Sequence, residues 1–62
     1  MFADRLKKYR IEAGMTQKEL AEKLNASQNT ISQYESGKRN PTVKNLLVIA
    51  GLLGCSVDEL TC

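Results

Sequence analysis

The chain of 62 residues is long enough for one domain with a small core, so its net stability should be on the order of a few kcal/mol. No apolar run is long enough to span a membrane, and basic residues interrupt the N-terminal segment. We therefore expect neither a membrane anchor nor a signal peptide, and we expect a cytoplasmic location. There is no His to activate a Ser or Cys nucleophile, and the spacing of Cys55 and Cys62 matches no zinc pattern. We expect no catalytic residue, no metal and no cofactor.

The first predicted helix covers residues 2–13. Its apolar side chains recur at spacings of four, three and four, which places them on one face: Phe2, Leu6, Tyr9 and Ala13. Gly14 supplies the left-handed residue that commonly ends a helix. The formal net charge of the chain is only +2, so the distribution of charge matters more than its total. We interpret the basic residues of this helix mainly as solubilising charge.

Two short helices joined by a tight turn should follow within residues 16–37. Thr16 and Glu19 fit a capping box, in which the Thr hydroxyl accepts from the Glu amide and the Glu carboxylate reaches back. This pattern predicts a helix over Gln17–Leu24, and Asn25 suits the turn because Asn tolerates positive φ better than most residues. The expected buried positions of this helix are Leu20, Ala21 and Leu24.

The third predicted helix runs over Gln28–Ser36, with Ser27 as its cap. Ile31 and Tyr34 are three residues apart and should face the core. The opposite face carries only neutral side chains that donate and accept hydrogen bonds: Gln28, Asn29, Ser32 and Gln33. Because Gln and Asn amides can pair bidentately with adenine, this face predicts readout of DNA bases. The alternative is a merely solvated polar face, which would more often carry Lys and Glu.

A basic connection leads to the last two helices. Pro41 cannot continue the third helix, and Thr42 is a good cap for a helix over Val43–Leu53. We expect its inward stripe to be Val43, Leu46, Leu47, Ala50 and Leu53, with Ile49 at the edge. Ser56 and Glu59 fit a second capping box, which should open a short helix anchored by Val57 and Leu60. Apolar residues recur at three and four rather than two, so the predicted fold is all-α, five short helices in a single domain over residues 1–62.

An ordered set of short motifs runs along nearly the whole chain: Leu6-Lys7, Gly14-Met15-Thr16-Gln17, Glu19-Leu20-Ala21, Thr30-Ile31-Ser32, Tyr34-Glu35, Leu46-Leu47 and Ser56-Val57-Asp58-Glu59-Leu60. Their order and spacing resemble the Cro/C1-type (XRE-like) helix-turn-helix domains of phage repressors and bacterial regulators. The resemblance implies a lambda-repressor-like fold and sequence-specific binding of double-stranded DNA, with the third helix in the major groove. It also implies a transcriptional regulator, foremost a repressor. A protein-interaction module, antitoxin-like or scaffolding, that keeps the fold without base readout is the alternative.

The resemblance assigns roles to two groups of residues. Base readout falls first to Gln28 and Asn29, then to Gln33 and last to Ser32. Phosphate contact and positioning fall to the helix starts and the basic loop: Thr16, Gln17, Ser27, Lys38, Arg39, Asn40, Thr42 and Lys44. Free backbone amides at helix starts attract phosphates, and Gln17 could also brace Gln28.

We expect two further contacts: an ion pair within the chain and a dimer contact between two copies of it. The family often pairs the residues that correspond to Arg10 and Glu35 in a partly buried salt bridge, and two independent surface charges are the alternative. The fourth helix departs from the usual family pattern at Val48 and Gly51, where an extra apolar stripe suggests a homodimer on a palindromic operator. The predicted dimer contacts are Val48, Gly51, Leu52, Cys55, Val57 and Leu60, and a loosely covered surface is the alternative.

Overall fold

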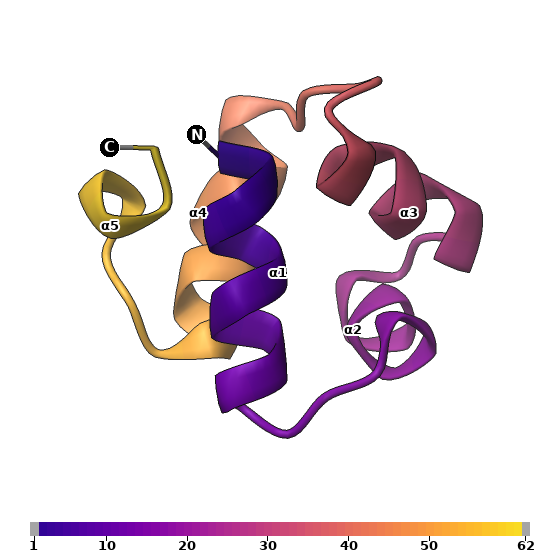
Figure 1. Ribbon diagram of the computed structural model, residues 1–62, viewed down its shortest axis with the longest axis horizontal. Helices are drawn as coiled ribbons and strands as arrows, with labels where there is room; N and C mark the ends of the chain where they lie inside the picture. Colours follow the sequence, from indigo (N-terminus) through magenta and orange to yellow (C-terminus); the bar gives the residue numbers. More distant parts are fainter. Residues whose placement is uncertain (1, 62) are drawn as a thin grey trace.

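The computed structural model describes residues 2–61, and within them every regular element is a helix (Figure 1). In chain order the helices are α1 (Phe2–Glu12), α2 (Gln17–Leu24), α3 (Gln28–Ser36), α4 (Val43–Leu53) and α5 (Val57–Thr61). The all-α fold of five short helices is therefore confirmed, with the first helix one residue shorter than predicted. No helix within residues 2–61 is long and apolar enough to cross a membrane.

Side-chain caps define where the helices begin. At the start of α2 the Thr16 hydroxyl accepts from the Glu19 amide at 3.0 Å, and Glu19 accepts from the Thr16 amide at 3.0 Å. The capping box before α5 has the same form, with distances of 3.1 and 2.9 Å between Ser56 and Glu59. Asn25 ends α2 with a φ of 59°, in the left-handed region. The predicted helix starts and this turn are confirmed because each depends on residues only three or four apart.

The two capping carboxylates, Glu19 and Glu59, should contribute less to stability in acid than at neutral pH. Hydrogen bonds from the Thr16 and Ser56 amides lower the pKa of Glu19 and Glu59 below their unfolded value of 4.5. The stabilisation they provide is therefore present above pH 4.5 and is lost as the pH falls through the lowered pKa values. We expect a Glu19→Gln/Glu59→Gln variant to have a flatter stability profile on the acid side, measured by urea unfolding at a series of pH values. Parallel profiles for variant and wild type would remove this role.

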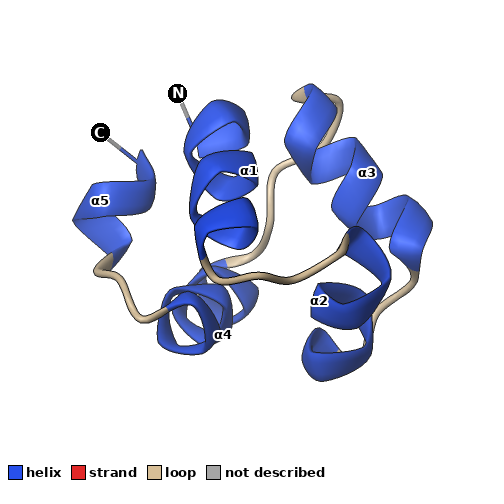
Figure 2. Cartoon of the chain, turned by 60° about the horizontal axis from the view of Figure 1, so that its bottom comes forward, coloured by secondary structure: helices blue, strands red, loops and turns tan. Residues whose placement is uncertain are grey.

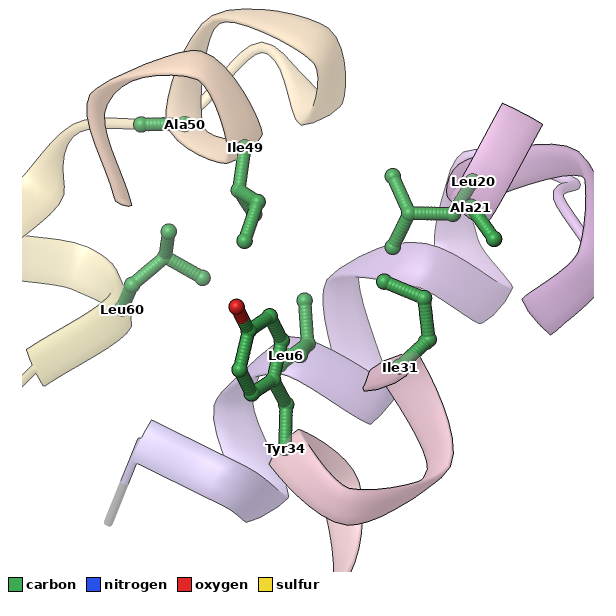
Figure 3. Close-up of a cluster of buried hydrophobic side chains, with 8 residues drawn as sticks. All are labelled: Leu6, Leu20, Ala21, Ile31, Tyr34, Ile49, Ala50 and Leu60. Carbon is green, nitrogen blue, oxygen red and sulfur yellow. The ribbon is translucent and has the colours of Figure 1, made fainter. Parts of the chain in front are cut away.

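The core lies where all five helices meet (Figure 3). Its buried side chains are Leu6, Leu20, Ala21, Ile31, Tyr34, Ile49, Ala50 and Leu60. The Tyr34 ring stands edge-on to Phe2, with 6.4 Å between ring centroids, and its hydroxyl accepts from the side-chain nitrogen of Asn45 at 3.5 Å. Since Ile31 and Tyr34 are both buried, the orientation of α3 is set by its inner face.

The predicted inward stripe of α4 is wrong at two positions. Val43 is 75% exposed and Leu47 is 58% exposed, whereas Ile49, expected at the edge, is completely buried. The helix meets the core through Ile49 and Ala50, with Leu46 packed beside them. An almost wholly apolar helix offers more than one stripe at spacings of three and four, so periodicity alone cannot choose the buried one.

The prediction of Leu60 as a dimer contact is also wrong, because its side chain is completely buried in the core. The short helix α5 packs against α1 and α4, and Arg5 donates to the Glu59 carbonyl oxygen at 2.9 Å. Three other predicted dimer contacts are partly buried against the same core: Leu52, Cys55 and Val57. Only Val48 and Gly51 of the predicted set are exposed.

Candidate nucleic-acid interface

The helices α2 and α3 lie together at one end of the molecule, with α5 at the other (Figure 2). Gln28, Asn29 and Ser32 are exposed on α3, and Gln33 is half-buried. The predicted reading face is thus presented to solvent as an uncharged, hydrogen-bonding surface. Its side chains can donate and accept at the same time, which suits the edges of base pairs better than a purely cationic surface does.

Hydroxyl groups of Ser27 and Thr30 stabilise the start of α3. The Ser27 hydroxyl accepts from the Thr30 amide at 3.2 Å and lies 2.9 Å from the Thr30 hydroxyl. Thr16 and Thr42 cap α2 and α4 in the same way, the latter by accepting from the Asn45 amide at 3.2 Å. The structure therefore places these three hydroxyls at helix starts, and their predicted contact with phosphates stays a prediction. The Thr16 and Thr42 hydroxyls accept their cap bonds and keep their own hydrogens, which they can donate to a phosphate.

The predicted ion pair between Arg10 and Glu35 is present. The Arg10 Nε donates to Glu35 Oε2 at 2.6 Å, and Nη2 donates to Oε1 at 3.1 Å. The two side chains are only 11% and 4% exposed, so this bidentate pair is largely removed from water. The remaining Arg10 nitrogen, Nη1, donates to the Met15 carbonyl oxygen at 2.8 Å, which ties α1 and the loop after it to α3.

Gln17 extends this pair into what we call the Arg10–Glu35–Gln17 network. Its Nε2 donates to Glu35 Oε1 at 3.1 Å, so the first residue of α2 is joined to the last turn of α3. Sequence reasoning missed this contact, and the structure does not show the bond to Gln28 that it suggested as an additional role. Gln17 and Glu35 belong to different helices, so no regular spacing in the sequence indicates that they are in contact.

The loop between α3 and α4 carries exposed cations that lie next in sequence to the end of α3. Lys38, Arg39 and Asn40 are all exposed, and Lys44 is exposed in the first turn of α4. The backbone amides of Lys38 and Arg39 both donate to the Gln33 carbonyl oxygen, at 3.0 and 3.3 Å. The loop is therefore anchored to the end of α3 while its charged side chains stay free for contact with an anion.

Within residues 2–61 the candidate binding site is an open surface and not a cavity. Residues 2–61 contain no pocket and no group of three or more acidic or Cys side chains that could hold a metal ion. What the surface combines is a neutral reading face, helix starts and a flanking basic loop. This combination fits a long polyanion that carries hydrogen-bonding groups between its charges.

Known proteins resemble this chain in sequence and in fold. The Helix-turn-helix family model matches residues 6–60. The HTH-type transcriptional regulator ImmR of Bacillus subtilis (strain 168) is 48% identical over 56 residues, which are 90% of this chain and 44% of ImmR. The chain spans about half the length of the curated relatives it matches.

Two solved structures with DNA have the same fold. The P22 c2 repressor in complex with a synthetic operator superposes with a TM-score of 0.91 at 30% identity, covering 97% of this chain and 91% of that one. SinR, a master regulator for biofilm formation, in complex with DNA superposes with a TM-score of 0.91 at 33% identity, covering both chains completely. The family model, the relatives and the fold agree: the chain belongs to the Cro/C1-type helix-turn-helix family.

Proposed function

We propose that the chain binds double-stranded DNA in a sequence-specific manner and regulates transcription, foremost as a repressor, with α3 in the major groove. The observation that carries this proposal is the exposed, uncharged face of α3 beside an exposed basic loop. The two DNA complexes with the same fold and the regulators among the relatives support it. The curated relatives cited above are named as transcriptional regulators, which favours a chain without catalytic activity that works on DNA in the cytoplasm.

The roles divide between bases and phosphates. Gln28 and Asn29, in the first turn of α3, meet base edges in the groove, with Gln33 and Ser32 further along the same face. The phosphate contacts come from the helix starts and the basic loop, and they set the register without selecting a sequence. Thr16, Gln17, Ser27, Lys38, Arg39, Asn40, Thr42 and Lys44 form this second group.

Two double variants separate the roles. Lys38→Ala/Arg39→Ala should weaken binding to every duplex similarly and lower the salt dependence of binding by about two charges. Gln28→Ala/Asn29→Ala should keep the salt dependence but lose about tenfold or more of the preference for the operator, since each good bidentate base contact contributes about 1–3 kcal/mol of discrimination. Fluorescence anisotropy over a salt series, with specific and scrambled duplexes, measures both. If the second variant kept full preference, α3 would not be the reading helix.

We further propose that two copies bind a palindromic operator as a homodimer through the outer face of α4. The exposed apolar residues of this helix lie together on that face: Val43, Leu47 and Val48. Gly51 is exposed nearby, and a Cβ there would meet no atom within 4 Å, so no contact within residues 2–61 requires a glycine at this position. Gly in a helix interior costs roughly 1 kcal/mol relative to Ala, and close approach of a second helix would offset that cost.

A charge on this face tests the dimer. Leu47→Lys should abolish cooperative operator binding and shift sedimentation toward the monomer, with little change in folding stability. Ile11→Lys is the matched control, because Ile11 on α1 is also 58% exposed and gains the same charge. Equal sedimentation and cooperativity for the two variants would argue against the α4 interface.

A further inference from the structure

The hydrogen bond from Gln17 to Glu35 fixes which way the Gln17 side chain points. An ionised carboxylate only accepts hydrogen bonds, so the amide nitrogen of Gln17, rather than its carbonyl oxygen, must face Glu35. The distance from Nε2 to Glu35 Oε1 is 3.1 Å, and the Glu35 side chain is 4% exposed. The largely buried carboxylate of Glu35 therefore orients the side-chain amide of Gln17, which is half-buried at the first position of α2.

One N–H of the Gln17 amide remains available after this bond. Phosphate oxygens also only accept, so this remaining N–H is the part of the Gln17 side chain that can bind a DNA phosphate. A Gln side chain without a fixed partner would present either end of its amide and would lose rotamer freedom on binding. Fixing it beforehand lowers that cost.

The charge of Glu35 does not oppose this arrangement, because Arg10 compensates it. The guanidinium holds both carboxylate oxygens, at 2.6 and 3.1 Å, so the pair presents no net charge to an approaching phosphate. Gln17 can then stand between two anions, with one N–H donated to the carboxylate and the other to the phosphate.

We propose that Glu35 is a positioning residue for DNA binding: it orients the Gln17 amide so that its free N–H meets a backbone phosphate. This inference rests on the proposed function, and it gives the buried ion pair a role in binding that is separate from its role in folding. Arg10 makes the arrangement possible by neutralising the carboxylate.

Two charge-matched double variants separate positioning from folding. Arg10→Met/Glu35→Gln keeps a carbonyl oxygen that can accept from Gln17, whereas Arg10→Met/Glu35→Leu leaves no acceptor. Both remove one cation and one anion, so neither changes the net charge. Affinity for a DNA operator, chosen from random duplexes with the wild-type chain, is measured for each variant with and without Gln17→Ala.

We expect Gln17→Ala to cost about tenfold in affinity in the wild-type and Glu35→Gln backgrounds, since a hydrogen bond to a charged group is involved. In the Glu35→Leu background that tenfold loss should already be present, and Gln17→Ala should add nothing. Equal tenfold losses from Gln17→Ala in all three backgrounds would overturn the positioning role while leaving the proposed function intact. A wild-type chain that selects no duplex would overturn both.

NMR of the wild-type chain gives a test that no folding defect can disturb. The two side-chain N–H signals of Gln17 should be widely separated in the free protein, unlike those of the exposed Gln28. The signal not bonded to Glu35 should shift on adding operator. If the two N–H signals of Gln17 were no further apart than those of Gln28, the inference would be overturned.

Discussion

Arg10→Met should destabilise the fold by about 3 kcal/mol or more, because it leaves the carboxylate of Glu35 buried without its cation. The Glu35 side chain is 4% exposed and would also have lost two of its three hydrogen-bond donors. For a domain of 62 residues, whose net stability is on the order of a few kcal/mol, this is most of the total. The midpoint of urea unfolding followed by circular dichroism measures the effect.

Lys7→Met is the matched control for this prediction. Lys7 is an exposed cation on the same helix, so its loss removes the same charge without uncovering a buried partner. We expect its effect to stay within about half a kcal/mol. If both variants unfolded at the same urea concentration, Arg10 and Glu35 would act as independent surface charges.

Leu60→Ala should cost about 2–5 kcal/mol, the range for removing a large side chain from a packed core. Leu60 is completely buried between α5 and the rest of the core, so its loss should detach the last helix as well as leave a cavity (Figure 3). Leu47→Ala makes the same chemical change at a 58% exposed position and should change stability little. Thermal unfolding compares the two, and sedimentation records whether the folded fraction changes its oligomeric state. A stable Leu60→Ala variant that had merely become monomeric would return Leu60 to a dimer interface.

The features that sequence predicted correctly are local ones. Thr16 and Glu19 cap α2 through bonds between residues three apart, and Asn25 marks the turn by its own conformational preference. The exposure of the polar face of α3 follows in the same way, because burying Ile31 and Tyr34 determines which side of a regular helix is left outside.

The features that sequence missed depend on how helices meet. In α4 almost every residue is apolar, so the choice of Ile49 rather than Leu47 for the core was made by the neighbouring helices. The five residues of α5 are too few to show a period, so the sequence offered Leu60 both as an anchor of this helix and as a dimer contact. The contact of α5 with α1 decides that Leu60 points inward. The bond between Gln17 and Glu35 joins two helices and has no local signal. Such contacts follow from packing angles that a single sequence does not specify.

Selection of binding sites from a random duplex library tests the central claim most directly. If α3 reads DNA bases in the major groove, the wild-type chain should enrich one motif, and Gln28→Ala/Asn29→Ala should lose that enrichment. If two copies bind together, the motif should be palindromic, with half-sites about 10 base pairs apart. A library that stays random after repeated rounds, despite binding that weakens with salt, would contradict base readout by α3.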